Sequence, residues 1–268
     1  MALRLIKAHA FGNDFLLVDQ EAIRGVTDRA ALAREACDRH RGIGADGLIL
    51  FTRTPDGASM QLLNADGSYS EISGNGVRCL AAAIAMRDRL RPGARVDIET
   101  DAGVKRLDLL DDRDRCYTFR AAMGHPEQVT TVRLTVGTEP IDAVTLRVGN
   151  PQCVVLGEVT EDRLHRIASA LAVHPHFLHG TNVELATLES PDRVRILIWE
   201  RGVGPTEASG TGACAAAVAA MSYGGANRDL EVVSPGGTQR VEWTEEGLFL
   251  TGWAQVVGEV AWHRGGAW

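Results

Sequence analysis

The sequence predicts an α+β protein of two pseudo-symmetric domains, each a sheet wrapped around a central Ala-rich helix. Two observations lead to this prediction. A Gly-rich hexamer occurs twice, 136 residues apart, and an Ala-rich run follows it each time. Short strand patterns cluster without the regular alternation of strand and helix that a doubly wound sheet needs.

The repeat extends beyond the hexamers, which read E-I-S-G-N-G at 71–76 and E-A-S-G-T-G at 207–212. Further similarities follow in the same order: Gly12-Asn13 with Gly149-Asn150, Asn64 with Glu200, Thr100–Gly103 with Ser234–Gly237, and the helical patterns after Thr27 and Thr160. The repeat therefore predicts one domain over 1–130 and a second over 131–268. The crossover is expected in Val129–Glu139, after the turn signal Gly124-His125-Pro126.

Strands are predicted where β-branched and apolar residues are bounded by Gly, Pro or Asp. These segments are Arg4–Lys7, Phe15–Asp19, Leu48–Thr52, Val96–Glu99, Thr145–Val148, Val194–Trp199, Leu230–Val233 and Leu248–Gly252. Two further helices are predicted to begin near residues 74 and 210, because Ser73 and Ser209 are preferred N-cap residues and Ala-rich runs follow. These runs are apolar almost all round, which is typical of a buried helix.

Composition and charge exclude several classes of protein. The net charge is −7, so the chain lacks the general basic character of a nucleic-acid-binding protein. No apolar run approaches the length of a membrane span and no secretory signal is evident, so we expect a cytoplasmic protein with no membrane partner. Five cysteines without a C-x-x-C pair indicate neither a disulfide framework nor a zinc ribbon.

The histidine cluster of the second half is a weak candidate for a metal site. His174, His176 and His179 lie close together, but no carboxylate or cysteine completes a ligand set nearby. The pattern is typical of a polar loop, and we predict no metal. Cys79 and Cys214 lie well inside the two Ala-rich helices, so we expect them to be buried structural residues.

The two Gly-rich loops point to anion binding. Each places backbone N–H groups at a helix N-terminus, where the partial positive charge of the helix dipole attracts a carboxylate. One such loop alone is more typical of a simple helix start, but two symmetry-related copies predict a shared cleft between the domains. Polar residues suited to an amino acid recur in the pattern: Asn13, Asn64, Asn75, Asn150, Asn182, Glu200 and Arg201. Glu suits a substrate ammonium and Arg a carboxylate, although Asn at turns is also common for structural reasons.

These segments together resemble the diaminopimelate epimerase family over essentially the whole chain. The matching segments are H-A-F-G-N-D-F (9–15), G-I-G-A-D-G (42–47), N-A-D-G-S (64–68), S-G-N-G-V-R-C (73–79), G-N-P-Q (149–152), G-T-N-V-E (180–184), W-E-R-G-V-G (199–204), S-G-T-G-A-C-A (209–215) and P-G-G (235–237). The resemblance implies a cofactor-independent enzyme that interconverts LL- and meso-diaminopimelate for lysine and peptidoglycan precursor synthesis. It also implies two pseudo-symmetric domains with the site between them, and a homodimer.

The resemblance further implies roles for individual residues. Substrate binding falls to Asn13, Asn64, Asn150, Asn182, Glu200 and Arg201, and the backbone amides of Gly74, Asn75, Gly210 and Thr211 hold the reacting carboxylate. The family uses two cysteines, one on each side of the substrate Cα, as base and acid. Here those catalytic positions hold Ser73 and Ser209. Gln152 is a further departure, because many members carry His there, and Gly47 stands where some have Gln.

The serines matter because the reaction removes a very weakly acidic proton. A thiol has a pKa of about 8.5, whereas the pKa of an alkyl hydroxyl is far higher and close to that of water. The gap of about 7 units corresponds to about 9–10 kcal/mol as an upper bound. No His–Asp relay is evident near either serine in the sequence.

Three interpretations therefore stay open. In the first, the chain is an epimerase impaired by a Cys-to-Ser change at both positions. In the second, it is a natural racemase or isomerase that acts on a different substrate or uses serine in acid–base isomerisation. In the third, it is a non-catalytic amino-acid-binding relative.

Overall fold

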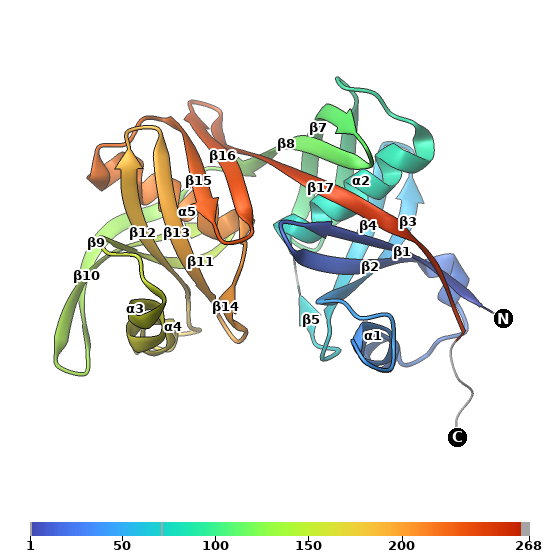
Figure 1. Ribbon diagram of the computed structural model, residues 1–268, viewed down its shortest axis with the longest axis horizontal. Coiled ribbons are helices and arrows are strands. Elements are labelled where there is room, and N and C mark those ends of the chain that lie inside the picture. The colour runs from blue at the N-terminus through green and yellow to red at the C-terminus, as the bar shows by residue number, and fades with distance from the viewer. Residues whose placement is uncertain (1, 71, 264–268) are drawn as a thin grey trace. The chain divides into compact units, whose positions relative to one another are not determined.

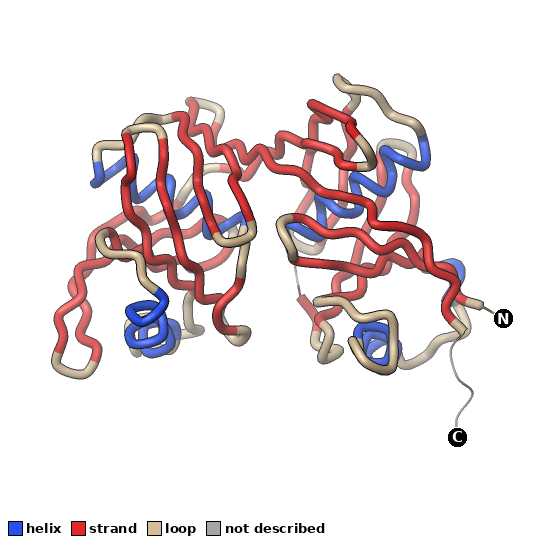
Figure 2. Tube along the Cα trace, viewed as in Figure 1, coloured by secondary structure: helices blue, strands red, loops and turns tan. Residues whose placement is uncertain are grey.

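The computed structural model describes residues 2–70 and 72–263 (Figures 1 and 2), so Met1, Glu71 and residues 264–268 lie outside the description. The chain forms two compact units. Unit 1 comprises Met1–Ala121 with Trp253–Trp268, and unit 2 comprises Ala122–Gly252. Both units combine a strand-rich sheet with helices, which confirms the predicted α+β class.

The strands of unit 1 wrap around one helix. They are β1 (Leu3–Ala10), β2 (Asn13–Asp19), β3 (Gly47–Thr54), β4 (Gly57–Asn64), β5 (Tyr69–Ser70), β6 (Arg95–Thr100), β7 (Gly103–Arg113) and β8 (Cys116–Gly124), with the second part of β17 (Gly247–Trp262). β2 pairs in parallel with β3, and β4 in parallel with β6, while the other pairs are antiparallel. Because β17 pairs with both β1 and β8, the strand order returns to its start.

Unit 2 repeats this plan. Its strands are β9 (Glu127–Val136), β10 (Glu139–Val148), β11 (Asn150–Leu156), β12 (Asn182–Ser190), β13 (Arg193–Glu200), β14 (Gly204–Thr206), β15 (Asp229–Ser234) and β16 (Gly237–Thr244), with the first part of β17. β11 pairs in parallel with β12, and β13 with β15, as the equivalent strands do in unit 1. All the predicted strand segments lie within observed strands.

Each sheet encloses an Ala-rich helix, α2 (Gly74–Asp88) in unit 1 and α5 (Gly210–Ala219) in unit 2, with strands on both sides of it (Figure 2). Their small side chains allow the strands to approach closely, and most of both helices is buried. In unit 2, α5 packs against Val154, Ala186, Ile196 and Ile198 of the sheet. Cys79 and Cys214 are both fully buried, as predicted.

Shorter helices cover the opposite faces of the parallel strands. The 3-10 turn η1 (Gln20–Ile23) and α1 (Arg29–Cys37) pack on β2 and β3 in unit 1. α3 (Glu161–Arg163), η2 (Leu164–Ala168) and α4 (Ser169–Ala172) pack on β11 to β13 in unit 2, and η3 (Ala220–Gly224) follows α5. Thr160 caps α3 as predicted, whereas α1 is capped by Asp28, one residue after the predicted Thr27.

The division between the units differs from the predicted boundary at 130/131. The segment expected as a crossover, Val129–Glu139, forms most of the β9–β10 hairpin inside unit 2. The chain instead changes unit within β8, between Ala121 and Ala122, and returns within β17, between Gly252 and Trp253. The reason is that β9 pairs with the adjacent β10 inside unit 2, while the end of β17 pairs with β1, so unit 1 is completed by a strand from the C-terminal end of the sequence.

Candidate functional site

Unit 1 presents one helix N-terminus with the predicted serine at its cap. Ser73 has extended backbone torsions, and its Oγ accepts a hydrogen bond from the Gly76 amide at 3.1 Å. The first amides of an α-helix have no partner within the helix, so they are available to an anion. Residues 73–76 are called the Ser73 turn below.

A chain of polar side chains supports the Ser73 turn. Asn75 Nδ2 donates to Asn13 Oδ1 at 3.2 Å, and Asn13 Nδ2 donates to Asp46 Oδ2 at 2.8 Å. Arg39 then bridges Asp46 and Asp14, with Nη2 2.9 Å and 2.8 Å from their carboxylate oxygens. The sequence pattern pointed to both asparagines but not to the ionic groups that orient them.

A buried cation lies behind the same turn. Arg78 is 1% exposed, donates to Asn75 Oδ1, and places its guanidinium 5.7 Å from the ring centre of Phe11. Asn64 lies at the end of β4, where its Nδ2 donates to Ser68 Oγ at 2.9 Å. The Ser73 turn therefore combines helix amides with the side chains of Asn13 and Asn75 and the positive charge of Arg78.

Unit 2 presents the matching helix N-terminus. Ser209 Oγ accepts from the Gly212 amide at 3.2 Å, and the side chain is 5% exposed. Residues 209–212 are called the Ser209 turn below. The two cap geometries are nearly the same, with φ of −131° at Ser73 and −137° at Ser209.

The predicted binding residues of unit 2 form two hydrogen-bonded groups. Asn150 Oδ1 accepts from Gln152 Nε2 at 2.6 Å, which fixes the asparagine at the start of β11. Asn182 Oδ1 accepts from the Arg201 backbone amide at 2.9 Å, and the Arg201 guanidinium donates to the His179 carbonyl at 2.7 Å. Glu200 ends β13, next to Arg201.

A buried carboxyl group lies against the Ser209 turn, and no sequence motif singled it out as a functional group. Glu184, on β12, is 0% exposed, and neither of its carboxylate oxygens has a hydrogen-bond partner within the described residues. A Cβ atom at Gly212 would lie only 2.6 Å from Glu184 Oε1. Burial, and then the charge of Glu200, raise the pKa of Glu184 well above its usual value.

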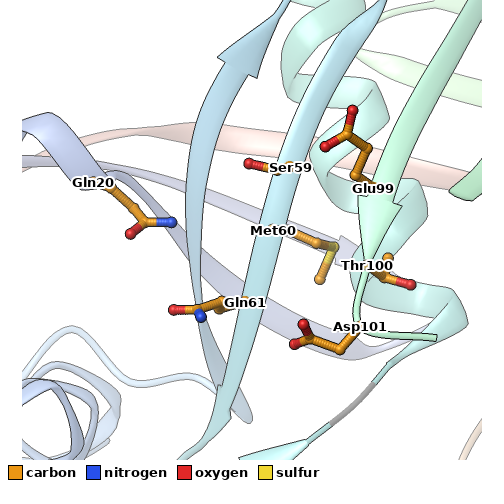
Figure 3. Close-up of a pocket in the computed structure, with 7 residues that line it drawn as sticks. All are labelled: Gln20, Ser59, Met60, Gln61, Glu99, Thr100 and Asp101. Carbon is orange, nitrogen blue, oxygen red and sulfur yellow. The ribbon is translucent and has the colours of Figure 1, made fainter. Parts of the chain in front are cut away.

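Two surface depressions lie apart from both turns. One, of about 260 Å³, is lined by Gln20, Ser59, Met60, Gln61, Glu99, Thr100 and Asp101, from β4, β6 and the segments after β2 and β6 (Figure 3). The other, of about 400 Å³, is lined by Met86, Arg115, Gly258 and Glu259. Neither includes a predicted site residue. Within residues 2–70 and 72–263, no three His, Cys, Asp or Glu side chains gather as a metal ion would need.

The sequence model of the family described as diaminopimelate epimerase matches residues 5–129 and 144–257. Among curated proteins, the diaminopimelate epimerase of Desulforudis audaxviator is 38% identical, over 98% of this chain and all of its own length. That of Desulfitobacterium hafniense is 37% identical, over 95% of this chain and 96% of its own.

Solved structures share the fold at low sequence identity. A predicted epimerase from Pseudomonas aeruginosa has a TM-score of 0.74 at 15% identity, covering 98% of this chain and all of its own. A probable proline racemase from Agrobacterium radiobacter has a TM-score of 0.73 at 18% identity, covering 96% of this chain and 92% of its own. A hydroxyproline epimerase from Agrobacterium vitis, with bound trans-4-hydroxy-L-proline, has a TM-score of 0.71 at 16% identity, covering 97% and 90%.

Proposed function

Because the chain belongs to the diaminopimelate epimerase family, whose members are PLP-independent isomerases, we propose that it binds diaminopimelate and moves the proton at a substrate Cα. The reaction interconverts the LL and meso forms, for lysine and peptidoglycan precursor synthesis, without a cofactor. The observation that carries the proposal is the pair of serine-capped helix N-termini, one in each unit and with nearly the same cap geometry. A cytoplasmic homodimer is part of the proposal, and light scattering tests the dimer.

The substrate is held by groups of matched charge. The reacting carboxylate accepts hydrogen bonds from the amides at the two turns, where the helix dipoles favour an anion. Those amides belong to Gly74, Asn75, Gly210 and Thr211. Glu200 binds the ammonium group and Arg201 a carboxylate, and Asn13, Asn64, Asn150 and Asn182 supply directed hydrogen bonds.

Ser73 and Ser209 occupy the two positions from which a proton is removed and returned. One group takes the Cα proton, the electron pair stays on the substrate next to its carboxylate, and the other group donates a proton to the opposite face. A hydroxyl is a far weaker acid than a thiol, so formation of a free alkoxide is costly. We therefore expect the unmodified chain to epimerise slowly while it still binds diaminopimelate.

The test compares the chain with the double variant Ser73→Cys/Ser209→Cys. Proton NMR in D₂O follows Cα–H exchange and LL-to-meso conversion, and calorimetry measures diaminopimelate binding. We expect comparable binding by both proteins and epimerisation at least 100-fold faster in the double variant, since a positioned acid or base contributes about 10²–10⁴-fold. Ser222→Cys, at an exposed position in η3, is the control for an added thiol.

Two outcomes would contradict the proposal. If neither protein binds diaminopimelate, the substrate is wrong, and a racemase or isomerase of a different substrate becomes the better interpretation. If both bind it but neither exchanges the Cα proton, the chain is a binding protein and the expected geometry is absent.

A further inference from the structure

Beneath the Ser209 turn, unit 2 holds a set of buried polar atoms without hydrogen-bond partners in the part of the chain that the structure describes. They are Gln152 Oε1, both carboxylate oxygens of Glu184, and Thr206 Oγ1. The strand register brings them to one face. Glu184 pairs with Ile198 and Ile198 with Thr206, while Gln152 pairs with Asn182, two residues before Glu184 on β12. Ile198 packs in the core around α5, so this face points toward that helix.

The Glu184 carboxyl reaches the serine turn itself. A Cβ placed on Gly212 lies 2.6 Å from Glu184 Oε1 and 3.2 Å from Ser209 Cβ, so the two atoms are within about 6 Å of each other. Ser209 Oγ lies on the same turn, at 3.2 Å from the Gly212 amide. One water molecule or a rotation of the Ser209 side chain spans such a distance.

The equivalent place in unit 1 is apolar. A Cβ placed on Gly76, the counterpart of Gly212, lies 3.2 Å from Ile49 Cδ1 and 3.6 Å from Phe15 Cε1. Ile49 occupies on β3 the position that Glu184 has on β12, because both strands pair in parallel with the preceding strand in the same register. The fold is therefore built equally well with an aliphatic side chain here, and the carboxyl is not a packing requirement.

An unpaired buried carboxyl is costly, since burial penalises its charge and leaves its oxygens without partners. The titratable groups on the elements packed around it are Cys153 of β11, Arg193, Arg195 and Glu200 of β13, Cys214 of α5, His165 and Arg166 of η2, and Tyr223 of η3. Arg193 and Arg195 form ion pairs with Glu189, toward the other end of β12. Glu200 disfavours a second negative charge, and no Lys or Arg is among the groups that shift the pKa of Glu184. Glu184 is therefore a neutral acid over a wider pH range than an ordinary glutamate, and it gives up its proton at higher pH.

We propose that Glu184 is a positioning residue that exchanges a proton with Ser209, so that the chain exchanges the Cα proton on the Ser209 face faster than it inverts the centre. The inference rests on the proposed function. When Glu184 is ionised, the Cα–H bond breaks, its proton bonds to Ser209 Oγ, and the former Oγ–H proton passes to the Glu184 carboxylate. The electron pair remains on the substrate, and the reverse transfer restores all three groups.

This relay avoids a free alkoxide on one face only. Ser209 gives up its own proton as it gains another, so the carboxyl rather than the hydroxyl sets the proton affinity of the pair. In the Ser73 turn, Asn75 accepts a hydrogen bond from Arg78, and the position behind the turn is filled by Ile49 and Phe15. Exchange with retention of configuration is therefore expected to exceed epimerisation in the unmodified chain.

The experiment measures Cα–H exchange of diaminopimelate in D₂O against pH, for the unmodified chain, Glu184→Gln and Glu184→Asp. Exchange should rise with pH, because ionised Glu184 is the proton acceptor. Glu184→Gln should lower the rate at least tenfold and flatten the profile, while diaminopimelate binding stays within twofold. Glu184→Asp, which keeps a carboxyl, should retain the pH dependence at a reduced rate.

A second comparison separates the relay from a structural role. In the Ser73→Cys/Ser209→Cys background a thiol needs no relay, so Glu184→Gln should change the rate less than threefold there. Equal losses in both backgrounds would overturn the inference, and so would a lack of exchange by the unmodified chain while the double Cys variant is active. Failure of every variant to bind diaminopimelate would instead contradict the proposed function.

Discussion

The two units share one plan but differ beneath the Ser73 and Ser209 turns. Unit 1 places Phe15 and Ile49 behind the Ser73 turn, with the buried Arg78 two residues beyond it. Unit 2 places Gln152 and Glu184 at the corresponding positions behind the Ser209 turn. The cap hydrogen bonds and backbone torsions of the two serines are nearly the same. The repeat thus fixes where the two serines stand, and the residues behind each turn determine the chemical surroundings of each serine.

The two turns differ in the charged and titratable groups that lie near them. A guanidinium near the Ser73 turn favours negative charge there, and it is held by Asn75 of the same turn. A carboxyl near the Ser209 turn provides a place for a proton. We expect the two serines to be unequal, although they are related by the internal repeat.

The largest expected effect separates the two single cysteine variants. Ser73→Cys leaves the relayed serine on the other face, so it should epimerise at least tenfold faster than Ser209→Cys, whose remaining serine has no carboxyl. Both should remain well below the double variant, because inversion needs an acid and a base together. Initial rates of LL-to-meso conversion by NMR measure this order. The reverse order, or equal rates, would show that the carboxyl behind the turn does not assist Ser209.

The second expected effect is on the free energy of unfolding. It is produced by substituting the residue behind each turn with the residue type found in the other unit. Glu184→Ile gives unit 2 the residue type of unit 1 and removes a buried carboxyl without partners, so the free energy of unfolding should rise by about 1–3 kcal/mol at pH 8. Ile49→Glu should lower it by a similar amount or more. Urea unfolding, with hydrogen exchange of α5 and α2 amides to assign the unit, measures both changes. A loss of stability in Glu184→Ile would contradict this account.

The same pair of units has opposite pH dependences. The folded-state pKa of Glu184 is raised, so unit 2 binds more protons when folded and loses stability as pH rises from the unfolded value of about 4.3. Burial raises the pKa of Asp14 in unit 1, but hydrogen bonds from Arg39 and Lys7 outweigh it and hold the pKa below its usual value. Unit 1 therefore loses stability as pH falls through that lowered pKa. The advantage of Glu184→Ile should accordingly grow between pH 5 and pH 8.

Much of the fold was predictable because it depends on local patterns that occur twice. The Ser-Gly-x-Gly turns, the Ala-rich helices and the short strands all follow from nearby residues, and the structure confirms them. The closing of unit 1 by the end of β17 was not predictable, because its partner β1 lies at the opposite end of the sequence. Pairing of that kind leaves no local signal. The β9–β10 hairpin is local by contrast, but the repeat predicts a crossover at Val129–Glu139 and no strand there, so the hairpin was missed.

The serines and asparagines of the candidate site were predictable from the sequence, whereas the carboxyl behind the Ser209 turn was not. Ser73, Ser209 and the asparagines stand at turns and strand ends, where a polar side chain is noticeable in the sequence. Glu184 stands in the run N-V-E-L-A, and its burial depends on which face of β12 points toward α5. The available signal was the repeat itself, which aligns this glutamate with Ile49 and so marks a carboxyl at an apolar position.

The smallest expected effect concerns the glycines that face these two residues. Alanine is favoured over glycine in a helix by about 0.5–1 kcal/mol, and both Gly76→Ala and Gly212→Ala receive that gain. At Gly76 the new methyl meets Ile49 Cδ1 at 3.2 Å and Ser73 Cβ at 3.3 Å, so we expect a net change within about 0.5 kcal/mol. At Gly212 it falls 2.6 Å from Glu184 Oε1, so the buried carboxyl must move, and we expect a loss of about 1 kcal/mol relative to Gly76→Ala. Urea unfolding measures both, and Glu184→Ala supplies the control because it removes the atom that the methyl meets. If Gly212→Ala is equally costly with and without Glu184, the carboxyl does not occupy the space behind the Ser209 turn.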